Sequence, residues 1–151
     1  MSPPIHVFEP REGETHISVR DWPDARAPWR VRSADKRGRE LEIAGYSNFK
    51  DQLVGRLTLH VDGRKPLMIT RYSFEEHLIT FARPEVLGQL VLCAQAIATR
   101  LHEDLKVGNG SLMWEMEGRQ LAEISKRFPQ FGVLPRRKRF RRGKRYLVWR
   151  P

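Results

Sequence analysis

The sequence predicts an α+β fold, in which a long helix covers one face of a small antiparallel β-sheet and a basic arm follows at the C-terminus. Three observations carry this prediction: alternating apolar and polar residues over 55–82, a helical apolar period from residue 84, and a cationic run over 136–145. The chain has 151 residues, of which 40% are hydrophobic. That is enough to bury the core of one domain.

The N-terminal part of the chain gives short, interrupted signals. Residues 1–14 contain three prolines and are expected to be an irregular lead-in. THISVR, residues 15–20, alternates as a short strand does. Asp21 can cap a short helix that Pro28 then limits. RELEIAGY, residues 39–46, predicts another brief strand.

The clearest sheet signal is GRLTLHVDGRKPLMITRYSFEEHLITFA, residues 55–82. In its first strand, Leu57 and Leu59 point to one face, while Thr58 and His60 point to the other. An Asp-Gly turn and two further candidate strands, PLMITRY and EHLITFA, follow. The segment therefore predicts an antiparallel meander with one apolar face and one face of hydroxyls and cations.

The clearest helix is predicted from Pro84, which suits a first helical position, to a stop at Gly108. Its apolar residues recur at helical spacing: Leu87, Leu90, Val91, Ala94, Ile97, Ala98, Leu101 and Leu105. We expect this stripe to cover the apolar face of the meander. SLMWEM, residues 111–116, predicts a further strand, and GRQLAEISKRF, residues 118–128, predicts a second helix that Pro129 closes.

Arg or Lys occupies eight of the ten positions over 136–145, RRKRFRRGKR, and the strand-forming RYLVWR comes next. The formal net charge of the chain is +10, so residues 1–135 are close to neutral without this run. Such an excess favours a polyanionic partner, nucleic acid first and an anionic membrane surface second. We expect a folded domain over 15–135 and a basic arm over 136–151 that ends in an edge strand. A basic protein without such a partner is the alternative.

The sequence gives little sign of catalysis. The five histidines are scattered, and no glycine-rich phosphate loop or nucleophile elbow is present. Cys93, the one cysteine, falls on the apolar side of the predicted helix and is expected to be a core residue. We therefore predict a protein that is not an enzyme, with no metal, no cofactor and no membrane partner. A cytoplasmic or nuclear location follows from the single cysteine and the proline-rich, acidic start.

Nucleic-acid binding is the function that these residues favour. Hydroxyls and cations on one sheet face suit the phosphates and 2′-hydroxyls of duplex RNA, and an ordinary solvated face is the alternative. Trp22 and Trp29 can stack on bases, or they can fill the core. The candidate RNA-binding residues are Trp22, Trp29, Arg30, Lys50, Arg56, Thr58, His60, Thr70, Thr80, Arg136, Arg137, Lys138, Arg139, Arg141, Arg142, Lys144 and Arg145.

Three segments resemble the RNA-silencing suppressors of tombusviruses: PWRVRS, NFKDQLVGRLTLHV, and LITF followed by QLVLCAQAIATRLHEDL. The resemblance implies a viral homodimer whose two sheets form a saddle that holds short duplex RNA by its backbone. It implies that Trp29 caps the duplex end and that Lys50 and Arg56 lie on the binding surface. Arg26 stands where that family has a second tryptophan, which puts strict selection of duplex length in doubt.

The leading hypothesis is a non-enzymatic, sequence-independent duplex-RNA-binding protein that suppresses RNA silencing in a host cell by sequestering small RNAs. Two alternatives stay open. One is a structural component of a ribonucleoprotein or virion, with the basic arm threaded into nucleic acid. The other is a phage or mobile-element protein that inhibits an acidic protein partner.

Overall fold

The computed structural model describes residues 29–36, 40–47 and 52–151. The strand predicted for THISVR and the short helix predicted at Asp21 lie outside these residues, as do the candidate site residues Trp22 and Lys50. None of the helices in the described ranges combines the length and apolar character that a membrane crossing requires.

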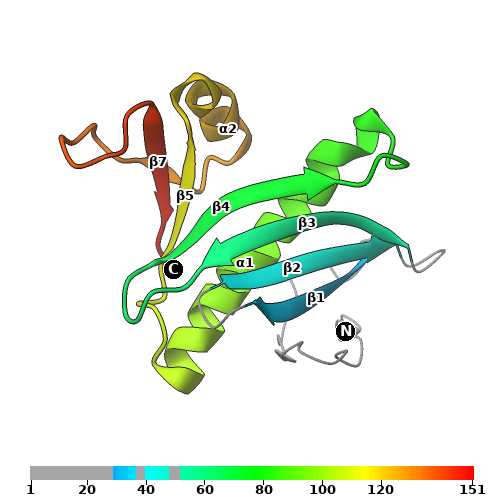
Figure 1. The fold of residues 1–151 in the computed structure, drawn as a ribbon, viewed down its shortest axis with the longest axis horizontal. Coiled ribbons are helices and arrows are strands. Elements are labelled where there is room, and N and C mark those ends of the chain that lie inside the picture. The colour runs from blue at the N-terminus through cyan, green and yellow to red at the C-terminus, as the bar shows by residue number, and fades with distance from the viewer. Residues whose placement is uncertain (1–28, 37–39, 48–51) are drawn as a thin grey trace.

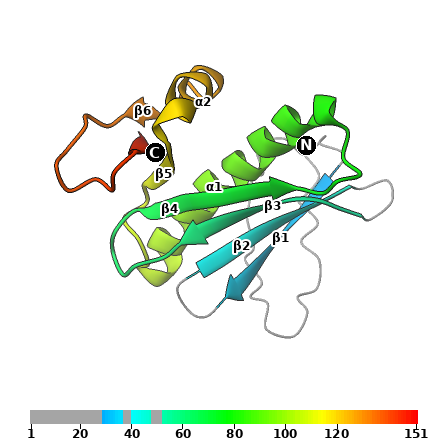
Figure 2. The same cartoon turned by 45° about the horizontal axis from the view of Figure 1, so that its top comes forward.

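One seven-stranded sheet runs through the molecule in the order β1-β2-β3-β4-β5-β7-β6 (Figure 1, with β6 labelled in Figure 2). Its strands are β1 (Trp29–Lys36), β2 (Glu40–Ser47), β3 (Leu53–His60), β4 (Leu67–Phe74), β5 (Leu112–Glu117), β6 (Gly132–Val133) and β7 (Lys144–Trp149). All neighbouring strands are antiparallel except β4 and β5, which are parallel. Within the meander predicted over 55–82, the antiparallel pair β3 and β4 is confirmed, but the whole sheet is larger and mixed.

A long helix explains the parallel pair. The helices are η1 (Thr80–Ala82), α1 (Arg83–Leu105), η2 (Gly118–Gln120) and α2 (Leu121–Arg127). α1 carries the chain from the end of β4 back to the start of β5, which is the connection that parallel neighbours need. It crosses one face of the sheet (Figure 2), as the apolar stripe predicts. Pro84 lies in its first turn, and the left-handed residue that ends it is Lys106.

The core lies between α1 and the sheet and continues under α2. Buried positions on α1 include Leu90, Val91, Ala94 and Ile97, which confirms the predicted stripe. Cys93 is buried among them, and burial raises the pKa of its thiol well above its ordinary value. The thiol is therefore an unreactive core group.

The segment EHLITFA is not a strand, so this prediction is wrong. β4 ends at Phe74, and the chain then makes local turns in which the Leu78 amide donates to the Glu75 carbonyl at 3.0 Å. A 3-10 turn over Thr80–Ala82 leads directly into α1. The backbone groups of this segment thus form hydrogen bonds within its own turns and do not pair with a neighbouring strand. Thr80 consequently lies at the start of the helix and not on the sheet face.

The cationic run connects two strands of the sheet. Residues 134–143 form a loop with turns between β6 and β7, while Lys144 and Arg145 belong to β7 itself. β7 pairs with β5 on one side and with β6 on the other. The predicted edge strand is therefore an interior strand, because the two-residue β6 folds back along its outer side.

Candidate functional site

The parallel ladder between β4 and β5 is short. It holds three residue pairs, Leu67 with Leu112, Met68 with Met113 and Ile69 with Trp114. β4 continues to Phe74 and β5 to Glu117, but the two strands no longer pair with each other. Figure 1 shows them diverging into a V.

A β-bulge marks the point where β4 turns away. On the β3 side of β4, Ile69 pairs with Leu59 and Arg71 pairs with Thr58, which leaves Thr70 as an extra residue. A bulge bends its strand and increases the local twist. The bulge at Thr70 directly follows the last residue that pairs with β5, and it therefore accounts for the opening of the V.

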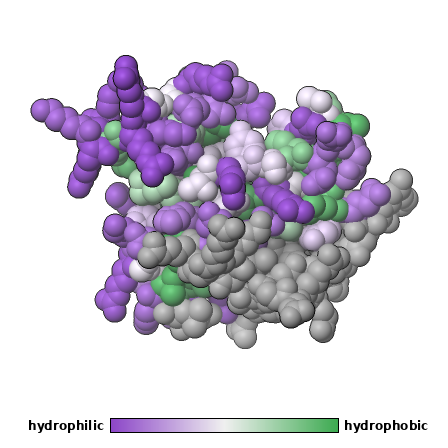
Figure 3. Space-filling view, in the orientation of Figure 1, coloured by the Kyte–Doolittle hydropathy of each residue, from purple (hydrophilic) through white to green (hydrophobic). Residues whose placement is uncertain are grey.

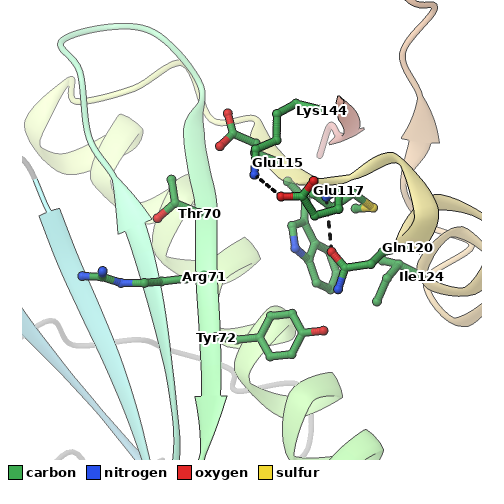
Figure 4. A pocket seen from close by; sticks show the side chains of 10 residues that line it. Thr70, Arg71, Tyr72, Glu115, Glu117, Gln120, Ile124 and Lys144 are labelled. Carbon is green, nitrogen blue, oxygen red and sulfur yellow. Dashed lines mark hydrogen bonds and ion pairs between the residues drawn. The ribbon is translucent and has the colours of Figure 1, made fainter. Parts of the chain in front are cut away.

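The V holds a cleft of about 350 Å³ (Figure 4). Its lining residues come from four elements: Thr70, Arg71 and Tyr72 of β4, Trp114, Glu115, Met116 and Glu117 of β5, Gln120 and Ile124 of the helical segment that follows, and Lys144 of β7. Alternation along β5 places the buried Leu112, Trp114 and Met116 on the α1 side of the sheet and places Glu115 and Glu117 on the opposite side. The cleft therefore has two chemically different faces.

Aromatic packing fixes the apolar face of the cleft. The buried Trp114 ring contacts Phe128 edge-on at 5.0 Å and Phe131 at 5.8 Å between centroids. Tyr72 meets the same indole at 6.1 Å in a T-shaped contact. The Tyr72 ring projects into the cleft in the direction of Gln120 (Figure 4). Tyr72 thus presents a hydroxyl from a fixed ring.

Glu117 is held in place at the rim. Lys144 Nζ lies 2.8 Å from its Oε1, and its backbone N–H donates to Gln120 Oε1 at 3.2 Å. The hydrogen bond from Lys144, together with the charge of that ammonium, holds the pKa of the Glu117 carboxyl below its ordinary value. Glu117 is therefore a poor proton acceptor.

Glu115 has a different environment. Its Oε2 accepts a hydrogen bond from the Tyr146 hydroxyl at 2.9 Å. Burial raises the pKa of Tyr146 and the bond to Glu115 acts in the same direction, so this hydroxyl stays protonated and donates. Among the described side chains, no cation lies within ion-pair distance of Glu115. The Tyr146 hydroxyl thus fixes the orientation of the half-buried Glu115 carboxylate.

The predicted cationic sheet face is largely neutralised. Arg56 pairs with Glu42 at 3.7 Å, and Arg71 of β4 pairs with Glu40 at the same distance. Thr58 is only 4% exposed, and its hydroxyl oxygen accepts a bond from Arg71 Nε. Two carboxylates of β2 thus form ion pairs with the arginines of β3 and β4. The sequence did not reveal these ion pairs.

The remaining predicted site residues do not form one site, because they lie on different parts of the sheet and its loops. Thr70 and Lys144 line the cleft, whereas Trp29 and Arg30 lie on β1 at the far end of the strand order and His60 ends β3. Arg145 is half-buried on β7, and the other cations of the run lie on its preceding loop: Arg136, Arg137, Lys138, Arg139, Arg141 and Arg142. Within 29–36, 40–47 and 52–151, no three His, Cys, Asp or Glu side chains come close enough to hold a metal ion.

Sequence reasoning missed the cleft residues Tyr72, Glu115 and Glu117 and the supporting Tyr146. The alternating carboxylates of WEME, residues 114–117, were the one available signal.

No protein-family model matches the chain, and no curated protein matches its sequence. Among solved structures, an acetyltransferase of Bacillus subtilis in complex with CoA is 11% identical, with a TM-score of 0.52 over 82% of this chain and 99% of the other. An N-acetyltransferase from Staphylococcus aureus Mu50 is 13% identical, with a TM-score of 0.51 over 74% and 67%. These two likenesses show that the chain has the fold of these acetyltransferases.

These findings overturn the functional predictions. The resemblance to tombusvirus silencing suppressors is wrong, because the fold is that of acetyltransferases and LITF, its supposed last strand, lies in the turns before α1. The predictions of a non-enzymatic protein, a duplex-RNA partner, a viral homodimer and a host–virus role are wrong on the same finding, as are the ribonucleoprotein and inhibitor alternatives. The cytoplasmic or nuclear location stays a prediction.

Proposed function

We propose that this protein is an acyltransferase that moves an acyl group from a CoA thioester to an amine. One observation carries the proposal. The bulged strand β4 leaves β5 after three pairs and opens a two-faced cleft, in a fold shared with an acetyltransferase solved in complex with CoA.

The cleft fits the thioester end of such a cosubstrate. Beyond Ile69, β4 no longer pairs with β5, so its backbone N–H and C=O groups on that side are available to an extended chain. Trp114, Met116 and Ile124 supply apolar surface for the methylene groups.

The start of α1 offers few free amides to the diphosphate end. The Arg83 N–H donates to the Thr80 carbonyl and Pro84 has no N–H, so the Arg83 guanidinium is the group that would meet an anion there. Arg83 is the first residue of the helix and lies over the Phe74 ring at 5.7 Å. Glu85 in the same turn and the absence of glycine over 75–82 make this a weaker phosphate site than a glycine-rich loop.

The two faces of the cleft suit two reactants. The thioester approaches on the apolar face beside Tyr72, and the amine approaches on the opposite face beside Glu115. The amine nitrogen attacks the thioester carbonyl, so a C–N bond forms and the C–S bond breaks. The proton of the nitrogen passes to the Glu115 carboxylate, and the Tyr72 hydroxyl donates a proton to the leaving thiolate.

The test uses acetyl-CoA and a panel of primary amines. Acetyl-CoA binding is measured by isothermal titration calorimetry, and turnover is measured by release of free thiol. Glu115→Gln is expected to lower kcat/KM by about 10²- to 10⁴-fold, the range for removal of a general base, while acetyl-CoA still binds.

Glu117→Gln is the matched control on the same strand. Because Lys144 already holds that carboxylate, we expect a loss below about tenfold. No heat of acetyl-CoA binding would contradict the proposed function. A larger loss in Glu117→Gln than in Glu115→Gln would contradict the role of Glu115.

A further inference from the structure

Residues 134–143, named here the basic loop, carry six exposed cations: Arg136, Arg137, Lys138, Arg139, Arg141 and Arg142. In the part of the chain that the structure describes, none of the six pairs with a carboxylate. Figure 3 shows hydrophilic side chains projecting from this corner of the molecule. Neighbouring like charges repel one another, so an anionic partner would lower the free energy of the loop.

The basic loop is attached to the rim of the cleft by two contacts. Phe140 packs on Tyr146 with ring centroids 4.5 Å apart, and Tyr146 in turn donates to Glu115 of the cleft. At the end of the loop, the Gly143 carbonyl accepts a hydrogen bond of 2.8 Å from the Gly118 amide, directly after β5. The cations are thus held beside the face of the cleft that carries the carboxylates.

The carboxylate face of the cleft and the basic loop together indicate which kind of acyl acceptor would bind. Glu115, which has no ion pair among the described residues, attracts an ammonium group into the cleft, while the basic loop attracts carboxylates outside it. We propose that the acceptor is an acidic peptide segment whose amine enters at Glu115 while its flanking carboxylates contact the basic loop. This inference rests on the proposed acyltransferase function.

Two properties of the acceptor favour a peptide: the number of carboxylates that it must carry and the nucleophilicity of its nitrogen. Six cations spread along a loop exceed what a small amine with one or two carboxylates can contact, whereas successive acidic residues can follow them. An acyl acceptor must also offer a nucleophilic nitrogen. Lysine and N-terminal amines do so, whereas the ring-conjugated amino groups of nucleic-acid bases are poor nucleophiles.

Binding is tested first without acetyl-CoA, by fluorescence anisotropy. The probes are a labelled peptide with one lysine flanked by four glutamates and the same peptide with four glutamines. We expect the glutamate peptide to bind at least about tenfold more tightly at low salt, and the difference to shrink as salt screens the exposed charges.

A charge-matched pair of variants locates the effect. The loop variant is Arg136→Gln, Arg137→Gln, Lys138→Gln and Arg139→Gln, and the control is Arg64→Gln, Lys65→Gln, Lys126→Gln and Arg150→Gln, four exposed cations elsewhere. Both lose four positive charges. The loop variant should lose the preference for the glutamate peptide and raise its KM in the thiol-release assay, whereas the control should keep both within about twofold.

Three results would overturn the inference: equal affinity for the two peptides, an equal loss in the control variant, or tighter binding of an RNA duplex of the same charge. Calorimetry with acetyl-CoA separates the two proposals. If acetyl-CoA does not bind, the proposed function fails, while the anisotropy result still decides whether the basic loop prefers an acidic peptide.

Discussion

Leu67, Met68 and Ile69 of β4 pair with β5, whereas the next three residues of the same strand, Thr70, Arg71 and Tyr72, do not. The paired, closed end is a buried apolar ladder. The unpaired, open end lines a cleft with hydroxyls, a guanidinium and two carboxylates opposite. The extra residue at the bulge, Thr70, separates these two ends within a single pair of strands. The closed end supports the fold, and the open end provides the site.

The largest expected effect comes from the closed end. Leu112→Ala removes a fully buried side chain and leaves a cavity, so we expect the free energy of unfolding to fall by about 2–5 kcal/mol. Urea denaturation measures this change. Thr70→Ala at the open end is the control and should cost less than about 1 kcal/mol, because Thr70 is exposed. Equal losses of unfolding free energy in the two variants would contradict the claim that only the closed end supports the fold.

Tyr72→Phe tests the open end. It removes the hydroxyl but keeps the ring contact with Trp114, so we expect stability to hold while kcat falls about 10- to 100-fold. Thiol release gives the rate, and Tyr46→Phe on β2, outside the cleft, is the control. An unchanged kcat would exclude Tyr72 as the proton donor.

Tyr146→Phe tests the support of Glu115. At neutral pH the lost hydrogen bond should cost about 0.5–1.5 kcal/mol of unfolding free energy. Because the pKa of Tyr146 is raised in the folded state, the contribution of the hydroxyl is complete below the ordinary pKa of tyrosine, and it is lost as pH rises through the raised value. Urea denaturation from pH 8 to pH 11 should show the two proteins converging. A constant difference would contradict this linkage.

The smallest effect is expected at the rim of the open end. Lys144→Gln removes the cation that lowers the pKa of Glu117. A lowered pKa stabilises the fold above the ordinary carboxyl pKa, and this contribution is lost as pH falls through the folded value. The variant should therefore melt slightly below the parent at pH 7 and level with it once the pH has fallen below the lowered pKa of Glu117. A gap that persists in acid would point to packing and not to charge.

The closed end was largely predictable from the sequence, since it depends on local patterns. Alternation located the strands that became β3 and β4, and the apolar period located α1. The parallel pairing of β4 with β5 was not predictable, because it joins segments that a long helix separates. The interior position of β7 was missed because it depends on β6, a strand of two residues that is too short to show a period in the sequence.

The open end was not predictable. Tyr146 reaches Glu115 only after β7 has paired with β5, and the two residues lie 31 positions apart in the sequence. The bulge at Thr70 depends on the register between β3 and β4, which the alternation over 55–82 does not specify. The basic run was the most visible feature of the sequence, but its charge alone gave the wrong partner. Its place beside the carboxylates of the cleft is what suggests a peptide.

Amide hydrogen exchange in the presence and absence of acetyl-CoA tests the central claim most directly, because it reads the two ends of one strand in a single experiment. We predict that acetyl-CoA slows exchange at residues 70–72 of β4 and leaves residues 67–69, which already pair with β5, unchanged. Unchanged exchange at 70–72 under saturating acetyl-CoA, or protection confined to β1 and β2, would contradict the claim that the split between β4 and β5 is the acyl-donor site.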